Sequence, residues 1–277
     1  MSNHHVSTSL YQSPWFHVQK RVENPTVRLF CFSYAGGSAS TFRDWCNQVP
    51  NGVEICSVQL PGRGTRFREP SLTSMNLLLD ALVQEFTPHC HVPFAFFGHS
   101  MGAQVAFEFT RRLRQCSEMC PVQLFVSGRC APQINSSRRP IHRLSEKDFI
   151  EEIKKLNGTP DEALQHPELM ELVSPILRAD IKLIETWKYI DDEPLEVPIT
   201  AFGGIDDGGV TARHLEDWGY QTCRDFSMQL FEGDHFFINT SRVNLLNTVS
   251  GILSPIVRSY AGTTPRLDKR SRVVHVA

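Results

Sequence analysis

One serine, two adjacent aspartates and one histidine stand in positions where they could carry out nucleophilic chemistry. Ser100 is the centre of a Gly-x-Ser-x-Gly pattern, Asp206 and Asp207 follow a pair of glycines, and His235 lies in a glycine-containing turn. A serine hydroxyl is a weak nucleophile at neutral pH unless an imidazole takes its proton, and a carboxylate must orient that imidazole. These residue types therefore predict attack of an activated alcohol on an acyl carbon.

The residues around Ser100 indicate a strand, a tight turn and a helix. The apolar run 93–97 leads into the pattern, and apolar residues then recur at helical spacing: Ala103, Ala106, Phe109 and Leu113. Such a turn lifts the hydroxyl clear of the sheet edge and has room only for glycine at Gly98 and Gly102. A five-residue pattern also arises by chance, but the flanking strand and helix favour a nucleophile.

The acid and the base are assigned from their order and their positions after strands. In α/β-hydrolases the order along the chain is serine, acid, histidine, and both Asp207 and His235 directly follow predicted strands. We favour Asp207 over Asp206 because Gly204-x-x-Asp207-x-x-Val210 follows the usual acid turn of hydrolases; Asp234 is a third candidate. His99 is expected to pack or to form a hydrogen bond beside the serine.

Two loops after early strands could complete the site. The strand expected over 27–34 ends in Ala35-Gly36-Gly37, and a glycine pair lets backbone N–H groups approach a ligand, although a simple turn would look the same. The strand expected over 53–60 runs into a loop with three arginines, Arg63, Arg66 and Arg68. That loop is either a solvated basic surface or one that steers a phosphate-bearing substrate.

The element order predicts an α/β-hydrolase fold, with a mostly parallel central sheet and helices on both faces. We expect an irregular lead-in over 1–25, the catalytic domain over 26–260 and a disordered tail over 261–277. Between the strands at 123–127 and 198–202 only helical signals occur, so residues 133–195 are predicted to form a helical lid.

Three helices are expected in this insertion. The first follows a capping box made by Ser145 and Asp148 and ends at Asn157-Gly158, the second begins at Thr159-Pro160, and the third begins at Ser174-Pro175. An amphipathic helix over 243–260 is expected to close the domain.

Composition excludes several other functions. The chain of 277 residues has a formal net charge of −2, which gives no reason to expect nucleic acid. Its apolar runs are too short to cross a membrane and its N-terminus does not resemble a signal peptide, so a cytoplasmic location is expected. Eight scattered cysteines form no Cys-x-x-Cys pattern, and His89-Cys90-His91 has no second ligand cluster, so no metal site is predicted.

Six segments together resemble the type II thioesterases, the editing enzymes of nonribosomal peptide and polyketide synthases. They are residues 32–38 (Phe-Ser-Tyr-Ala-Gly-Gly-Ser), 60–64 (Leu-Pro-Gly-Arg-Gly), 97–102 (Phe-Gly-His-Ser-Met-Gly), 156–160 (Leu-Asn-Gly-Thr-Pro), 177–180 (Leu-Arg-Ala-Asp) and 233–236 (Gly-Asp-His-Phe). The sequence is also similar to the medium-chain thioesterase of animal fatty acid synthase. This resemblance spans about residues 15–258 and implies a triad of Ser100, Asp207 and His235.

The resemblance further implies that the backbone N–H groups of Met101 and Ala35 form the oxyanion hole. By the same resemblance, the substrate would be an acyl group on the phosphopantetheine arm of a carrier protein domain. Because the arm belongs to that partner, the enzyme itself is expected to need no cofactor. A monomer is expected. Gly64 departs from the acidic residue that the family has after Leu-Pro-Gly-Arg.

Three alternatives remain at this point. One is a medium-chain acyl-carrier-protein thioesterase that terminates fatty acid synthesis. Another is a carboxylesterase or lipase, which would prefer oxygen esters. The third, from a different class, is a non-catalytic binding protein with a hydrolase fold.

Overall fold

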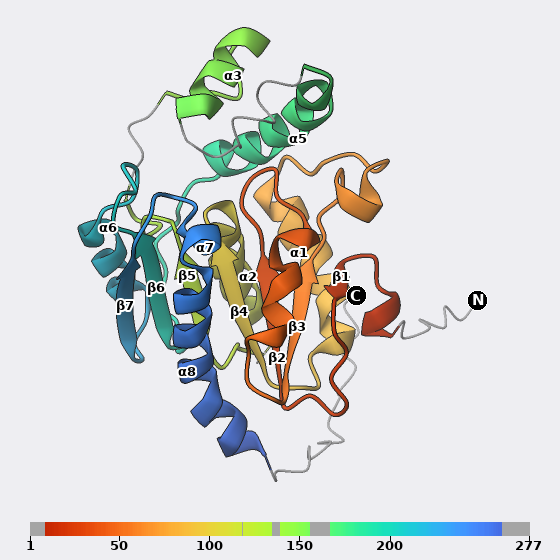
Figure 1. The fold of residues 1–277 in the computed structure, drawn as a ribbon, viewed down its shortest axis with the longest axis vertical. Coiled ribbons are helices and arrows are strands. Elements are labelled where there is room, and N and C mark those ends of the chain that lie inside the picture. Colours follow the sequence, from red (N-terminus) through yellow and green to blue (C-terminus); the bar gives the residue numbers. More distant parts are fainter. Residues whose placement is uncertain (1–8, 118, 135–138, 156–166, 262–277) are drawn as a thin grey trace, which may run out of the picture.

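A seven-stranded sheet forms the centre of the computed structural model, which describes residues 9–117, 119–134, 139–155 and 167–261 (Figure 1). The order across the sheet is β1-β3-β2-β4-β5-β6-β7, and every neighbouring pair is parallel except β1 with β3. The strands are β1 (Phe16–Val18), β2 (Val27–Phe32), β3 (Val53–Val58), β4 (Phe94–His99), β5 (Leu124–Ser127), β6 (Ile199–Gly204) and β7 (Phe226–Phe231). The predicted parallel sheet is therefore confirmed.

Helices cover both faces of the sheet, because the inner strands are apolar on both sides. Along β2, Phe30 packs into the cluster that contains α1 (Met75–Phe86) and α2 (Met101–Cys116), whereas Leu29 packs on the opposite face. That second face is covered by the 3-10 segment η2 (Ala39–Asn47) and by α8 (Arg242–Tyr260). Burial on both faces explains why these strands read as continuous apolar runs rather than as alternating patterns.

The shorter elements lie at the ends of the strands or between them. They are η1 (Leu10–Gln12), η3 (Gly64–Arg66), η4 (Thr87–His89), α6 (Ala212–Glu216), η5 (Asp217–Gln221) and α7 (Phe237–Thr240). No helix in the described ranges is both long enough and apolar enough to cross a membrane.

The lead-in predicted to be irregular over residues 1–25 contains a short strand that the sequence did not predict. There β1 pairs antiparallel with β3 at the edge of the sheet, and Trp15 is buried. The buried carboxylate of Glu54 accepts hydrogen bonds from the Tyr11 hydroxyl (2.9 Å) and the Val22 N–H (3.0 Å). A strand of three residues is too short to display an alternating pattern, so this edge could not be recognised from the sequence.

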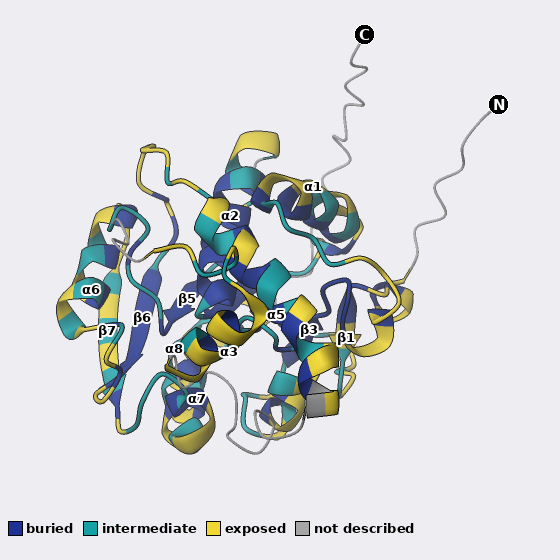
Figure 2. Ribbon diagram, turned by 90° about the horizontal axis from the view of Figure 1, so that it is seen from above, coloured by how far each residue is buried: buried dark blue, intermediate teal, exposed yellow. Residues whose placement is uncertain are grey.

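The insertion between β5 and β6 contains two described helices, α3 (Glu146–Lys155) and α5 (Pro167–Thr186). Both lie over the carboxyl ends of the central strands, above the sheet in Figure 1 and across its middle when seen from above in Figure 2. One half of the predicted capping box is present, since Ser145 Oγ accepts the Asp148 N–H at 3.2 Å; the Asp148 carboxylate accepts the Ser145 hydroxyl at 2.7 Å.

The start predicted for the last insertion helix, at Ser174-Pro175, is wrong. Helix α5 begins at Pro167 and runs through Pro175 without a break. The Ser174 hydroxyl, expected to start a helix, instead donates to Glu146 on the neighbouring α3. The helix start expected at Thr159-Pro160 lies outside the described residues, as do residues 1–8 and the tail from 262 onward.

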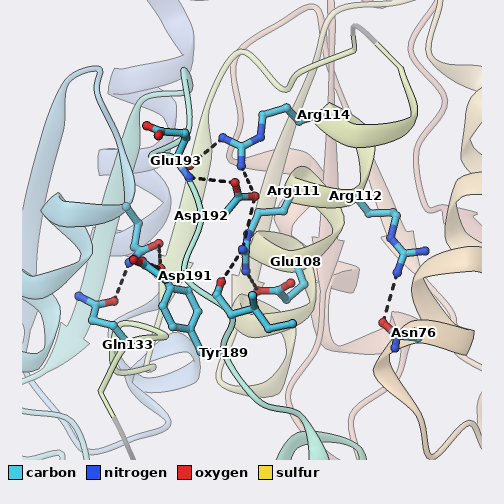
Figure 3. A network of polar contacts seen from close by, with 12 residues as sticks. Asn76, Glu108, Arg111, Arg112, Arg114, Gln133, Tyr189, Asp191, Asp192 and Glu193 are labelled. Atoms are coloured by element: carbon cyan, nitrogen blue, oxygen red, sulfur yellow. Dashed lines mark hydrogen bonds and ion pairs between the residues drawn. The ribbon is translucent and has the colours of Figure 1, made fainter.

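A polar network fixes the chain where it leaves the insertion (Figure 3). On α2, Arg111 donates to Glu108 Oε1 (2.9 Å) and to the carbonyl oxygen of Ile190 (2.6 Å). Arg114 donates to Asp192 Oδ2 (2.6 Å) and to the carbonyl oxygen of Glu193 (2.7 Å). The segment that follows α5 is thus tied to the helix that begins beside Ser100.

Candidate active site

Ser100 lies on a sharp turn between β4 and α2, with backbone φ 54° and ψ −113°. A Cβ atom at Gly98 would fall 2.1 Å from the carbonyl oxygen of Gly102, and one at Gly102 would fall 2.1 Å from the carbonyl oxygen of Phe32. Both contacts are to backbone, so neither can relax by a rotamer change. The expectation that only glycine fits at these positions is confirmed.

The structure brings Ser100, His235 and Asp207 into one hydrogen-bonded chain. Nε2 of His235 lies 3.0 Å from Ser100 Oγ, and Nδ1 of the same ring lies 2.7 Å from Asp207 Oδ2. The three residues follow β4, β7 and β6, whose carboxyl ends meet at one edge of the sheet. Asp206 is exposed and makes no contact with the ring in this chain of hydrogen bonds.

Asp207 is held in its ionised form. Its Oδ1 accepts the N–H groups of Gly209 (2.8 Å) and Val210 (3.1 Å), while Oδ2 faces His235. Burial favours the neutral acid and raises the pKa of Asp207, but the hydrogen bond and charge of His235 and the two backbone donors outweigh burial, so the pKa is lowered. A carboxylate in this state orients the imidazole and stabilises its positive charge.

His99 is fully buried beside Ser100 and supports the loop that carries His235. Its Nε2 lies 3.0 Å from the carbonyl oxygen of His235, and its Nδ1 lies 2.8 Å from Ser127 Oγ. A carbonyl oxygen can only accept, so Nε2 carries the proton and Nδ1 accepts from the serine hydroxyl. Burial, followed by the nearby His235, lowers the pKa of His99 to about 3, so the ring is neutral. The hydrogen bond expected for His99 is present.

The two expected oxyanion donors are the N–H groups of Met101, which follows Ser100 in the chain, and of Ala35, which follows β2, a strand paired with β4. Met101 is the first residue of α2, where backbone N–H groups have no partner within the helix. Within the described ranges, neither N–H donates to another residue. Tyr34, just before Ala35, packs edge-on against Phe236, with ring centroids 5.0 Å apart. Met101 therefore stands at a helix N-terminus directly after Ser100 and Ala35 follows the end of β2, and their role as oxyanion donors stays a prediction.

Both interpretations of the arginine loop after β3 need correction. Arg63 is 4% exposed and forms an ion pair with Asp180, and Arg66 is 7% exposed and forms one with Glu69. These two guanidinium groups are neither solvated nor free to bind a substrate phosphate; only Arg68 is exposed. Arg63 and Asp180 lie in two of the six motifs, but nothing in either segment identifies the other as its partner.

The described residues contain no group of three or more histidine, cysteine or acidic side chains that could hold a metal ion. The hydrogen-bonded chain of Ser100, His235 and Asp207 can activate the serine hydroxyl for acyl transfer to the serine, followed by transfer to water.

Comparison with known proteins agrees with this chemistry. Residues 27–253 match the family model of the thioesterase domain. Gramicidin S biosynthesis protein GrsT of Aneurinibacillus migulanus is 47% identical over 79% of this chain and 86% of its own length. The medium-chain S-acyl fatty acid synthase thioesterase of Rattus norvegicus is 31% identical over 85% of this chain and 87% of its own length.

A solved structure gives the same result. YbtT, the type II thioesterase from the yersiniabactin NRPS/PKS biosynthetic pathway, superposes with a TM-score of 0.74 at 30% identity, covering 89% of this chain and 98% of YbtT. The resemblance drawn from the six motifs and the α/β-hydrolase fold are both confirmed. The chain belongs to the thioesterase family, and it is a hydrolase of acyl thioesters.

Proposed function

We propose that this enzyme removes acyl groups from the phosphopantetheine thiol of carrier protein domains in a nonribosomal peptide or polyketide synthase, and so frees carriers that hold the wrong acyl group. The enzyme acts as a monomer and needs no cofactor of its own, because the pantetheine arm is part of the carrier. The observation that carries this proposal is the hydrogen-bonded chain from Ser100 through His235 to Asp207 in a member of the thioesterase family.

The first half of the reaction transfers the acyl group to the enzyme. Ser100 Oγ attacks the thioester carbonyl carbon while its proton passes to Nε2 of His235, and the N–H groups of Met101 and Ala35 donate to the oxyanion. As the carbon–sulfur bond breaks, the departing thiolate takes the proton from His235. Asp207 stabilises the imidazolium that exists between these two proton transfers.

The second half releases the acid. Water gives a proton to Nε2 of His235 and attacks the acyl carbon, and the oxyanion again lies against the two N–H groups. The ester bond breaks and Ser100 Oγ takes the proton back from His235. The products are a carboxylic acid and the regenerated serine, so every proton that leaves one group is received by another.

Ser100→Ala tests the proposal directly. Thiol release from acyl-pantetheine thioesters should fall by at least about 10³-fold, because a triad without its nucleophile cannot form the acyl-enzyme. The matched control is Ser40→Ala, which removes an exposed serine whose hydroxyl contacts Ser38; its thiol release should equal that of the wild type. Thiol release by Ser100→Ala within tenfold of the wild-type rate would refute the assignment.

The alternative of a chain-terminating medium-chain thioesterase keeps some support from the similarity to the rat enzyme, but the identity to GrsT is higher, 47% against 31%. A panel of carrier-bound acyl groups from acetyl to dodecanoyl separates the two functions. An editing enzyme accepts short and varied acyl groups. Hydrolysis confined to a narrow range of medium lengths would favour the terminating function instead.

A further inference from the structure

Helix α5 places one buried carboxylate against the loop that follows β2. Asp180 is 1% exposed and accepts two hydrogen bonds from the Arg63 guanidinium, Nη1 to Oδ2 at 2.5 Å and Nη2 to Oδ1 at 2.7 Å. The same Oδ2 accepts the backbone N–H of Gly36 at 2.7 Å. Arg63 Nη1 also donates to the carbonyl oxygen of Gly37 at 3.4 Å. One ion pair thus contacts two successive residues of the loop.

An apolar contact fixes the same loop from the same helix. Gly36 has φ +77°, and a Cβ atom built there would fall 2.6 Å from Leu177 Cδ2. Leu177 precedes Asp180 by three residues, so the two side chains share one face of α5. Ala35 packs against the cluster to which Leu177 belongs. The helix therefore holds the loop through packing as well as through charge.

Gln59 holds the arginine side of this arrangement. Its Nε2 donates to the carbonyl oxygen of Arg63 at 3.0 Å, and its Oε1 accepts the Ala39 N–H at 3.2 Å. Gly64 has φ +53°, and a Cβ atom there would lie 2.6 Å from Gln59 Oε1. A residue with a side chain at this position would be strained by the left-handed backbone and would also displace the end of the Gln59 side chain.

These contacts decide where the Ala35 N–H points. The carbonyl oxygen of Tyr34 accepts the Gly37 N–H at 2.9 Å. Because a trans peptide holds its N–H opposite to its C=O, a fixed Tyr34 carbonyl also fixes the direction of the Ala35 N–H. The turn that supplies this bond is itself held at Gly36 and Gly37 by Asp180 and Arg63.

We propose that Asp180 and Arg63 are positioning residues that hold the loop 35–37 so that the Ala35 N–H can donate to the oxyanion of the reaction. The inference rests on the proposed function, since it assigns support to one of its two oxyanion donors. A donor worth about 10²–10³-fold in turnover loses much of that value when it is displaced by a fraction of an ångström. Removal of the Asp180 charge leaves Arg63 buried without its partner and weakens the acceptor for Gly36.

The test compares Asp180→Asn with a matched carboxylate on the same helix. Glu185 accepts the N–H groups of Ile141 (2.8 Å) and His142 (3.1 Å), which lie within the insertion and not in the loop 35–37. Glu185→Gln thus perturbs the anchoring of the insertion without touching the oxyanion loop. For each variant, kcat and KM are measured with an acyl-pantetheine thioester, together with the inhibition constant of an alkyl trifluoromethyl ketone, which adds to the serine as a tetrahedral oxyanion.

For Asp180→Asn we expect kcat to fall about 10- to 100-fold with KM within about threefold of wild type, and ketone affinity to weaken by the same factor as kcat. For Glu185→Gln, kcat, KM and the inhibition constant of the ketone should each stay within about threefold of the wild-type value. Arg63→Lys keeps a cation against Asp180 but loses the two-pronged geometry, so it should show a smaller loss with the same pattern, and it serves if Asp180→Asn does not fold.

The inference is overturned if Asp180→Asn and Arg63→Lys both keep the wild-type kcat, or if their kcat falls while their affinity for the ketone is unchanged. It is also overturned if Glu185→Gln shows the same losses as Asp180→Asn. Failure of the proposed function is a separate result. It would appear as thiol release by Ser100→Ala, which no outcome with Asp180 or Arg63 can mimic.

Discussion

Replacement of His99 by glutamine should make the unfolding free energy fall less between pH 7 and pH 4.5 than it does in the wild-type enzyme. In the folded enzyme His99 is fully buried and its pKa is about 3, against 6.5 for the free side chain. Between these two values the unfolded chain binds a proton at this position and the folded chain does not, so falling pH favours unfolding. The stability associated with the neutral His99 ring is therefore present above about pH 6.5 and is lost as the pH falls towards 3.

The two pKa values fix the size of the effect. By proton linkage, this one residue favours the unfolded state by well under about 1 kcal/mol at pH 7 and by about 3 kcal/mol at pH 4.5. The unfolding free energy of the wild-type enzyme should therefore fall by about 2 to 3 kcal/mol more than that of His99→Gln between these pH values. The glutamine amide can still donate to the carbonyl oxygen of His235, so the loop keeps a partner.

Urea unfolding followed by circular dichroism at pH 7 and pH 4.5 measures this difference. Comparing the losses of the two proteins removes the contribution of every other titrating group, provided that the variant folds. His17→Gln is the control, because His17 is exposed on β1 and its replacement should leave the acid dependence unchanged. If wild type and His99→Gln lost equal stability between the two pH values, His99 would not be held neutral in the folded state.

Two further predictions concern the acid and the elbow. Asp207→Asn should reduce kcat by about 10⁴-fold, because the amide can no longer hold the required histidine tautomer, whereas Asp206→Asn should stay near wild type; thiol-release kinetics distinguish them, and the reverse ranking would reassign the acid. Gly102→Ala should prevent folding or lower the unfolding free energy by more than about 3 kcal/mol, because its Cβ would meet backbone at 2.1 Å. A soluble Gly102→Ala protein with a wild-type melting temperature would show that the turn can relax.

Most of the sheet could be predicted because its inner strands are buried on both faces. The runs that contain Phe30 and Phe96 are apolar at successive positions and end in glycine-rich turns, so both the strands and the edge that carries the site could be recognised. Asp207 could be preferred over Asp206 for a similar local reason. Its carboxylate accepts the backbone N–H groups of Gly209 and of Val210, the last position of the motif.

The features that escaped prediction depend on long-range contacts. Arg63 and Asp180 are 117 residues apart, and no local pattern shows that an arginine in a loop is buried. The continuation of α5 through Pro175 likewise depends on packing and on the contact of Ser174 with α3, not on local preference. These are tertiary effects that override the usual meaning of a Ser-Pro helix start.

The attachment of the insertion to the sheet limits how this enzyme can be re-engineered. The helices that lie over the site come from a single insertion, between β5 and β6. The nucleophile, base and acid come from other parts of the chain. A segment swap between relatives would therefore look like a simple way to change acyl selectivity. A grafted segment without a carboxylate at the place of Asp180 would remove the acceptor of the Gly36 N–H and the ion-pair partner of the Arg63 guanidinium. Chimeras should consequently exchange the insertion together with the loop that follows β2 and the loop that follows β3, so that Asp180, Gly36 and Arg63 come from the same parent.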